Sequence, residues 1–409
     1  MTEVILYGTL LLALYFQVFA LLTFLSRDAR LRREKARLES NFPKAAVIVP
    51  CWNEGTTIGG TVASLLALDY PAHKLEIILV NDGSTDNTRE VMDSYAGHPS
   101  ITIIHKENGG KHSAVNLGIQ KTDAEFIGCL DADSFVHPGA LKEVLAHFDD
   151  PQVAAVTASM TVHEPKNILQ EMQYAEYLAG VALRHILAAV NGLYVTPGPF
   201  SFYRKSILEK VGNFRHGHQT EDMEMAMRLQ QNGYKIENAP RAQVFTKAPH
   251  TVWGLIKQRT RWTSGFMRNS YDYRGLILNP RHGVLGLLVM PLGILALVAG
   301  MSLFVLTIAD TGRLVATAIA TQGDVPWSFA LSLPTFDWFY MPLTGIFVLG
   351  IVGVVVVTIT MYIGKHISGS QKPIARDIVW YLVFYSLIAP FWLFRSTAHV
   401  TLGVRNSWR

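Results

Sequence analysis

Long uninterrupted apolar runs occupy both ends of the chain, whereas the part between them alternates short apolar runs with polar segments. The first run, residues 4–24, has the length of about twenty residues that a helix needs to cross a bilayer. Three further runs follow late in the chain, at residues 284–307, 340–363 and 378–394. The pattern therefore predicts a soluble domain joined to four membrane-spanning helices.

The first half of the soluble part predicts an α/β domain. Apolar runs indicate strands at residues 45–49, 75–80, 101–104 and 125–130. Helical patterns lie between them, at residues 56–68, 86–95 and 111–120. Strands that alternate with helices indicate βαβ units on a mostly parallel sheet, where ligands bind beyond the carboxyl ends of the strands.

The second half has a mixed pattern that predicts three helices. Residues 168–190 are typical of a long amphipathic helix, and residues 220–231 of a helix that begins at an N-cap Thr220 and ends before Gly233. Residues 252–273 mix Trp and Tyr with Lys and Arg, which suits the headgroup region of a membrane. The alternative for this last stretch is an ordinary surface helix of the domain.

Charge places the domain relative to the membrane. The net charge is only +4, and no basic patch is interleaved with base-stacking aromatic residues, so we expect no nucleic-acid partner. Six Lys and Arg residues lie between residues 27 and 37, whereas only Glu3 is charged before the first apolar run. By the positive-inside rule the N-terminus is external and the domain is cytoplasmic.

The later connectors agree with this orientation. The first, residues 309–338, contains Asp310, Asp324 and Asp337 with only Arg313, so we expect it outside. The second, before the last apolar run, contains Lys365, Lys372 and Arg376, so we expect it inside. Parity then puts the C-terminus outside, although Arg395, Arg405 and Arg409 suit that side poorly.

The N-terminal run is interpreted as an anchor and not as a secretory signal, because it has no basic region before it and no small-residue cleavage site after it. Two cysteines, Cys51 and Cys129, support neither a zinc site nor a disulfide framework and suit buried positions in a reducing compartment. We therefore divide the chain into a transmembrane helix (1–26), a cytoplasmic domain (27–250), an interface segment (251–282) and a membrane region with about three helices (283–409).

Two acidic clusters follow predicted strands. Asp82 begins an Asp-Gly-Ser sequence after the second strand, and Asp131 and Asp133 follow the strand at 125–130. Two carboxylates at this spacing repel each other unless a cation lies between them, and hard oxygen ligands select Mg²⁺ or Mn²⁺. Such an ion would neutralise a diphosphate leaving group. The alternative is that each cluster simply forms a turn.

Taken together with the loop from Pro50 to Glu54, these clusters resemble the GT-A fold of the family 2 glycosyltransferases, over about residues 43–265. The resemblance implies binding of a nucleoside diphosphate sugar. The residues that it places around the donor are Pro50, Asn53, Glu54, Asp82, Lys111 and Asp131. By the same resemblance Asp133 binds the divalent ion, with Asp131 beside it.

Two later motifs extend the resemblance. Thr220-Glu221-Asp222 matches the position where the family has its general base, so Asp222, with Glu221 beside it, is the expected catalytic residue. The alternative is that these acids only complement the helix dipole. Gln258-Arg259-Thr260-Arg261-Trp262 matches a Q-x-x-R-W motif, in which Arg261 would bind the pyrophosphate and Trp262 the acceptor sugar. Gln258 of the same motif is expected to bind the nucleotide-sugar.

The order of these motifs is similar to that of membrane polysaccharide synthases, which make chitin, chitooligosaccharides, hyaluronan, cellulose or poly-N-acetylglucosamine. Gly198 and Pro199 fall in the segment that lines the acceptor pocket of that group, although Pro197 stands where its members often have serine. The resemblance implies an inverting, metal-dependent transferase in the plasma (inner) membrane. It would transfer sugar, first of all N-acetylglucosamine, from a UDP-sugar to a growing β-linked glycan.

Two other functions remain open at this point. One is a transferase that adds a single sugar to a lipid acceptor, and the other is an inactive glycan or nucleotide binder. The complete acidic set argues against the binder, because a binder has no need of Asp222. Expected partners are the UDP-sugar, a glycan or lipid acceptor and membrane lipids, and four spans are few for a closed pore, so a homo-oligomer is also considered.

Overall fold

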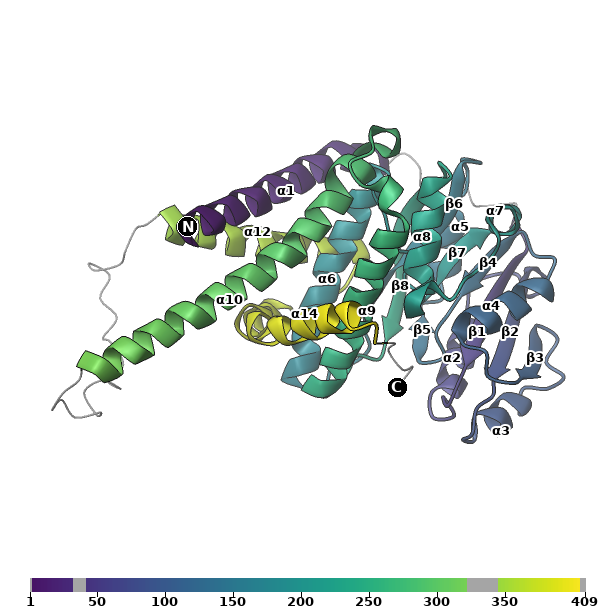
Figure 1. Ribbon diagram of the computed structural model, residues 1–409. Coiled ribbons are helices and arrows are strands. Elements are labelled where there is room, and N and C mark those ends of the chain that lie inside the picture. The colour runs from purple at the N-terminus through teal and green to yellow at the C-terminus, as the bar shows by residue number, and fades with distance from the viewer. Residues whose placement is uncertain (1, 32–41, 322–344, 405–409) are drawn as a thin grey trace.

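The computed structural model describes residues 2–31, 42–321 and 345–404, and in it a sheet-containing domain lies at one end of a group of long helices (Figure 1). The eight strands are β1 (Ala45–Cys51), β2 (Leu75–Asp82), β3 (Ile101–Lys106), β4 (Phe126–Cys129), β5 (Ser134–Val136), β6 (Val153–Val162), β7 (Ser201–Arg204) and β8 (Lys235–Thr246). They form one sheet in the order β3-β2-β1-β4-β7-β6-β8-β5.

The first half of the sheet is parallel, as predicted, because β1 pairs in parallel with both β2 and β4, and β2 pairs in parallel with β3. The second half is mixed. Strand β7 runs antiparallel to β4 and β6, and β5 runs antiparallel to β8, whereas β6 and β8 are parallel. The carboxyl ends of β1, β2 and β4 therefore meet at one edge, which is where the predicted acidic loops begin.

The helices of this domain cover both faces of the sheet. One face is covered by α2 (Ile58–Leu66), α3 (Thr88–Asp93) and α5 (Ala140–Leu145). The other is covered by α4 (Lys111–Gln120), α7 (Lys205–Val211), α8 (Glu221–Gln231) and one end of α6 (Ile168–Ala189). Strand β1 shows why the apolar runs are continuous, since Ala46 and Ile48 enter one core while Val47 and Val49 enter the other.

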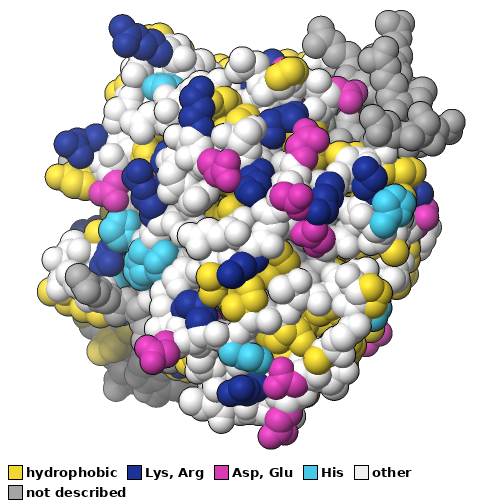
Figure 2. Space-filling view, turned by 90° about the vertical axis from the view of Figure 1, so that its right-hand side faces the viewer, with side chains coloured by type: hydrophobic (Ala, Val, Ile, Leu, Met, Phe, Trp, Pro, Cys, Tyr) yellow, Lys and Arg dark blue, Asp and Glu magenta, His cyan; other side chains and the backbone are white. Residues whose placement is uncertain are grey.

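Figure 2 shows the face of this domain that is farthest from the long apolar helices. Lys and Arg side chains are interspersed there with Asp and Glu, as on an ordinary water-exposed surface (Figure 2). The free thiols Cys51 and Cys129 are both buried in the cores, as expected for small packing residues.

The long helices are α1 (Thr2–Leu31), α9 (Val252–Asp272), α10 (Met290–Thr321), α12 (Gly345–Ser368) and α14 (Ser386–Thr401), with a short α13 (Ala375–Trp380) before α14. In the part of the chain that the structure describes, three helical stretches are long and apolar enough to cross a membrane: Leu285–Thr317, Phe347–Ser368 and Ala375–Thr401. They confirm that the C-terminal region forms three long apolar helices, as predicted. Helix α1 covers the N-terminal run, with an apolar part at Leu10–Ser26.

One boundary was predicted wrongly. Asp310 and Arg313 were expected in a connector, but α10 continues through both to Thr321. The two side chains form an exposed ion pair at 3.5 Å with i,i+3 spacing, and charged residues at exposed positions do not end a helix. Asp324, Asp337 and residues 340–344 of the next predicted span lie outside the described residues.

The amphipathic helix α6 connects the domain to the apolar helices. It contacts β6 and β8 on one side and α1, α12 and α13 on the other. Helix α9 in turn lies along α14, with Leu255 and Ile256 packed in a cluster that includes Met172 of α6 and Trp392 of α14. Both α6 and α9 therefore have one face on the domain and one on the C-terminal helices.

Candidate active site

The loops after β1 and β2 hold each other in place. The backbone N–H of Asn53, which has a positive φ of 55°, donates to Ser84 Oγ at 3.0 Å, and Asn53 Oδ1 accepts from the N–H of Thr85 at 2.8 Å. The N–H of Glu54 donates to Thr88 Oγ1 at 2.8 Å. The polar residues of the two strand ends thus make one rigid rim, and Pro50 lies half-buried at its base in β1.

Asp82 is buried at the end of β2, with 3% of its surface exposed. Its Oδ1 atom accepts from Lys106 Nζ at 2.5 Å and from the N–H of Gly109 at 3.0 Å, and its Oδ2 atom accepts from the N–H of Gly110 at 2.9 Å. Asp82 therefore fixes the glycine turn that precedes α4. The next residue of that turn is Lys111.

Lys111 joins the second acidic cluster to α8. Its Nζ atom lies 2.6 Å from Asp131 Oδ1 and 3.1 Å from Glu221 Oε1. Burial lowers the pKa of an ammonium group, but here the charges of Asp131 and Glu221 outweigh it and hold the pKa of Lys111 well above its usual value. The absence of a side chain at Gly198 leaves room for this group, because a Cβ there would lie 2.6 Å from Lys111 Nζ.

Asp222 lies in the first turn of α8, beside the same lysine. Its Oδ2 atom accepts from the N–H of Gly198 at 3.3 Å, and its Oδ1 atom from the N–H of Met223 at 2.8 Å. Burial and the neighbouring charge of Glu221 raise the pKa of Asp222 to about 6. A carboxyl group with such a pKa is a competent proton acceptor near neutral pH.

Glu221 behaves in the opposite way. Burial raises the pKa of a carboxyl group, but the charge of Lys111 dominates and lowers the pKa of Glu221 below its usual value. The pKa values of the two neighbouring acids thus shift in opposite directions. Glu221 is the ion-paired carboxylate, and Asp222 is the stronger base.

The Q-x-x-R-W segment lies on α9, and its two arginines contact different parts of the molecule. Arg261 donates to the backbone carbonyl of Gln219 at 3.2 Å, and its positive charge also acts on Glu221 and Asp222. Arg259 faces the other way and is buried, with an ion pair at 2.6 Å to Glu176 of α6. Its guanidinium lies 4.2 Å from the ring centroid of Trp262, and Gln258 accepts from it at 2.8 Å.

The two predicted metal ligands are partly exposed to solvent. Asp131 and Asp133 are both half-buried, Asp131 is paired with Lys111, and Ser134 Oγ donates to Asp133 at 3.3 Å. No cluster of three or more His, Cys, Asp or Glu side chains suited to a metal ion is found among the described residues. Two carboxylates nevertheless fit Mg²⁺ or Mn²⁺ chemically, since Mg²⁺ is commonly bound by one or two carboxylates plus the phosphates of a substrate.

The sequence of residues 43–265 matches the model of a family described as glycosyltransferase like family 2. The match covers more than half of the chain. The chain belongs to this family.

Curated relatives are similar over the same region of this family 2 glycosyltransferase. A poly-beta-1,6-N-acetyl-D-glucosamine synthase of Staphylococcus epidermidis is 33% identical over 221 residues, which are 53% of each chain. A synthase with the same name from Staphylococcus aureus is 35% identical over 224 residues, again 53% of each chain. The match thus spans about half the length of these relatives.

A solved structure is similar over nearly the whole chain. It is the mannosyltransferase PcManGT from Pyrobaculum calidifontis in complex with GDP-Man and Mn²⁺, with a TM-score of 0.59 and 19% identity, covering 97% of this chain and 99% of that one. This likeness concerns the fold, and it confirms the expected GT-A arrangement of a mostly parallel sheet with additional apolar helices.

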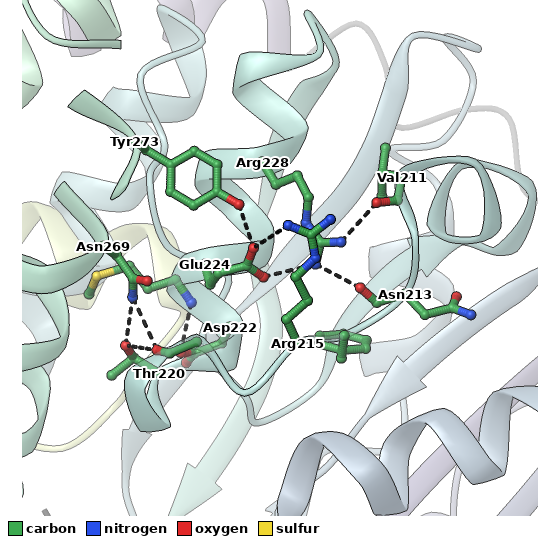
Figure 3. Close-up of polar contacts among 12 residues, drawn as sticks. Val211, Asn213, Arg215, Thr220, Asp222, Glu224, Arg228, Asn269 and Tyr273 are labelled. Atoms are coloured by element: carbon green, nitrogen blue, oxygen red, sulfur yellow. Dashed lines mark hydrogen bonds and ion pairs between the residues drawn. The ribbon is translucent and has the colours of Figure 1, made fainter. Parts of the chain in front are cut away.

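The start of α8 in this family 2 glycosyltransferase is held by a polar network (Figure 3). Glu224 accepts from Tyr273 and forms a buried ion pair with Arg228 at 2.8 Å. Arg228 in turn donates to the backbone carbonyls of Val211 and Asn213, at 2.8 and 2.7 Å. These contacts fix the helix that presents Asp222, from the core side and from the end of α9.

Thr220 takes a different role from the predicted one. It stands at the N-cap position of α8, but its hydroxyl makes no capping bond there. Instead Thr220 Oγ1 donates to Gly217 O at 2.9 Å and accepts from Asn269 Nδ2 at 2.9 Å (Figure 3). Close approach of α9 explains this, because a Cβ on Gly265 would lie 2.4 Å from that hydroxyl.

The predicted residues thus fall into two connected groups. The first group surrounds Lys111 and consists of Asp131, Lys111, Glu221, Asp222, Gly198 and Arg261, with Pro199 buried beside it. The second group lies along the rim and consists of Asn53, Glu54 and Asp82. The glycine turn connects it to the first group. Sequence reasoning missed Lys106, Glu176 and Asn269. Only Lys106 had a usable signal, since it ends a strand next to β2.

Proposed function

We propose that the protein is an inverting glycosyltransferase that uses a UDP-sugar, first of all UDP-N-acetylglucosamine, to extend a β-linked glycan. The observation that carries this proposal is the geometry at the start of α8: Glu221 is ion-paired with Lys111 at 3.1 Å, whereas the neighbouring Asp222 accepts backbone hydrogen bonds from Gly198 and Met223. Burial and the charge of Glu221 raise the pKa of Asp222. The choice of sugar is supported by the two staphylococcal relatives, which are named as poly-beta-1,6-N-acetyl-D-glucosamine synthases.

In the proposed reaction one proton is transferred, one bond forms and one bond breaks. Asp222 accepts the proton of an acceptor hydroxyl, whose oxygen forms a bond to the anomeric carbon of the donor sugar. The bond from that carbon to the diphosphate breaks, and UDP leaves with the electron pair. Attack from the face opposite the leaving group inverts the anomeric centre.

Other residues are proposed to bind and orient the two substrates. The rim formed by Pro50, Asn53, Glu54 and Asp82 would take the nucleoside, and Arg261 with Gln258 would face the diphosphate. A divalent ion, Mg²⁺ or Mn²⁺, held by Asp133 and Asp131 would neutralise charge that builds up on the leaving group. Trp262, Gly198 and Pro199 would line the acceptor side, where the ring of Trp262 is oriented by Arg259.

The membrane orientation is also a proposal. Arg376 pairs with Glu171 at the start of α6, and Tyr174 Oη lies 2.5 Å from Ser370 Oγ, so the basic segment before α13 lies on the side of the catalytic domain. The positive-inside rule then supports a cytoplasmic domain and an external N-terminus in the inner membrane. We also propose the division of the chain into segments that end at residues 26, 250 and 282. In this division α9 lies in the interface segment.

A donor screen tests the function. Membranes that contain the protein are incubated with individual UDP-sugars and Mg²⁺ or Mn²⁺, and UDP release and product mass are measured. UDP-N-acetylglucosamine should give the highest rate and a ladder of oligomers. A single lipid-linked product would support the alternative, transfer of one sugar to a lipid acceptor, and the absence of turnover with every donor would contradict both. Crosslinking of the same membranes checks the proposed homo-oligomer.

A further inference from the structure

Arg184 on α6 is a half-buried cation, and two of its three guanidinium nitrogens have no partner in the protein. Its Nε and Nη2 atoms are inaccessible to solvent and have no hydrogen-bond partner in the structure. Burial lowers the pKa of Arg184 to about 10, so the guanidinium is still charged at neutral pH. Burying an unpaired charge is costly, and proteins normally avoid it by pairing.

The two arginines that are buried in the described chain follow that rule. Arg228 is paired with Glu224 at 2.8 Å, and Arg259 is paired with Glu176 at 2.6 Å. Near Arg184 the groups that act electrostatically are the phenols of Tyr177 and Tyr194, and no carboxylate is among them. The site thus has a net positive charge that nothing in the described chain neutralises.

The neighbours of Arg184 come from α6 itself and, through Tyr177, from α9. Tyr177, Gly180 and Arg184 follow one another on one face of α6 at i, i+3 and i+7. Because Gly180 has no side chain, the guanidinium lies over it, and the three atoms that a Cβ there would approach most closely all belong to Arg184. On the α9 side, Arg259 lies 5.8 Å from the ring centroid of Tyr177 and stacks on Trp262.

The neighbours of Arg184 link the catalytic end of the molecule with the apolar helices. At one end, the charge of Asp133 acts on Tyr177. At the other end, Tyr194 packs against Phe266 with ring centroids 5.5 Å apart, and a Cβ on Gly293 of the apolar helix α10 would lie 3.0 Å from that phenylalanine ring. His185, next to Arg184, contacts Phe24 of α1. Residues of two long apolar helices, α1 and α10, thus lie close to the surroundings of Arg184.

We propose that Arg184 binds the phosphate group of a membrane lipid that enters between α6 and α9. A guanidinium fork pairs with phosphate through two parallel N–H···O bonds, and Nε and Nη2, the two unpartnered atoms, are one edge of that fork. The phenols of Tyr177 and Tyr194 can donate further hydrogen bonds to the same group. Two lipids carry this chemistry: an ordinary anionic phospholipid, and a polyprenyl phosphate that could serve as acceptor or primer.

The proposal goes beyond the transferase reaction, since binding of the lipid does not require any particular sugar. The purified full-length protein is stripped of lipid in a neutral detergent and mixed with phosphatidylglycerol, polyprenyl phosphate, phosphatidylcholine or inorganic phosphate. Bound lipid is counted by native mass spectrometry, and UDP binding is measured in the same samples as a test of folding. The variants are Arg184→Gln, Arg184→Lys and, as a matched control, the exposed Arg274→Gln.

The wild-type protein should retain one anionic lipid, and Arg184→Gln should weaken its binding about tenfold or more, because charge-assisted hydrogen bonds are lost. Arg184→Lys should be intermediate, and Arg274→Gln should bind like the wild type. Preference for phosphatidylglycerol or for polyprenyl phosphate identifies the source. Equal lipid binding by Arg184→Gln overturns the proposal. So does loss of UDP binding together with strong competition by inorganic phosphate, since Arg184 would then serve the donor diphosphate.

A second measurement separates binding from a structural role. In the lipid-free state Arg184→Met should raise the Tm, because it removes a half-buried charge that has no counter-ion, and added anionic lipid should raise the Tm of the wild type only. A fall in the Tm of the lipid-free Arg184→Met protein would show that the guanidinium stabilises the fold by itself and would contradict the proposal.

Discussion

The Nζ atom of Lys111 lies 3.1 Å from Glu221 Oε1, so the ammonium group at the start of α4 is paired with the acid that precedes the proposed base. The same ammonium group holds Asp131, and the amide of Gly110, one residue earlier, holds Asp82. Two neighbouring residues of one turn thus connect the three acidic segments that were predicted to meet.

Replacement of the proposed base should stop the reaction and leave donor binding intact. In Asp222→Asn the proton acceptor is lost, so kcat should fall by about 10²- to 10⁴-fold. UDP release gives the rate, and calorimetric titration with UDP gives the affinity, which should stay near the wild-type value. Asp272→Asn is the matched control, because Asp272 is an exposed acid on α9 that pairs with His218. Wild-type turnover by Asp222→Asn would refute the assignment.

The rate should depend on pH through Asp222. A raised carboxyl pKa means that the group is protonated, and therefore inactive as a base, below about 6. The value of kcat/KM should then fall about tenfold for each pH unit below that point and level off above it. The charge of Lys111 lowers the pKa of Asp222, so Lys111→Met should move the acid limb to higher pH. Lys142→Met, which changes a surface pair with Asp69, should not move the limb.

Asp82→Asn should destabilise the domain as well as weaken donor binding. The change leaves Lys106 at a mostly buried position without its counter-charge and weakens the bonds to Gly109 and Gly110. A loss of about 3 kcal/mol in the free energy of unfolding is expected for a broken buried pair. Thermal unfolding and UDP titration measure the two effects. Asp69→Asn, at a surface pair, should change stability by less than about 1 kcal/mol.

The ion pair between Glu176 and Arg259 should show strong coupling. Glu176→Gln leaves the buried Arg259 uncompensated and should cost several kcal/mol, whereas Glu176→Gln combined with Arg259→Gln should cost less than the two single changes added together. A double-mutant cycle on the unfolding free energy measures this coupling. Additive effects would mean that the pair does not hold α6 against α9.

Chelation should remove activity reversibly. Excess chelator should abolish UDP release, and Mn²⁺ or Mg²⁺ should restore it, because the diphosphate needs a counter-ion as it departs. Asp133→Ala should raise the metal concentration required for half-maximal activity, while Asp149→Ala, at an exposed acid in the loop after α5, should not. Undiminished transfer in the presence of chelator would contradict the role given to Asp133.

The parallel half of the fold could be predicted because its strands are continuous apolar runs that end in polar loops. Helix α4 has the predicted bounds, and β1 and β2 extend only two residues beyond the predicted strands. Strand β6 was not predicted, although all ten residues are buried, because Thr157, Ser159 and Thr161 interrupt its apolar pattern. Polar residues of β6 bond with β8, as in the hydrogen bond that Asn238 of β8 donates to Thr157 Oγ1 of β6. Such pairing between strands cannot be read from a single sequence.

The site residues could be predicted from strand ends and motif order, because Asp82, Asp131 and Asp222 all lie at strand ends or helix starts along one edge of the sheet. The pairing among them was not predictable. Nothing in the sequence says that Lys111 selects Glu221 and Asp131, or that Arg259 and Arg261, two residues apart on α9, serve different neighbours. Those choices depend on how α6, α8 and α9 approach one another.

The apolar faces of α6 and α9 are covered by residues of the last two apolar helices, among them Met361, Ile378 and Trp392. A shortened protein that ends after α9 would expose these faces to water and would aggregate or require detergent, even though its catalytic side chains were all present. The transferase half is therefore not an independent soluble enzyme that happens to be tethered. Its folding is completed by segments that are synthesised well after α9, so catalytic competence should arise only after the C-terminal helices have been inserted.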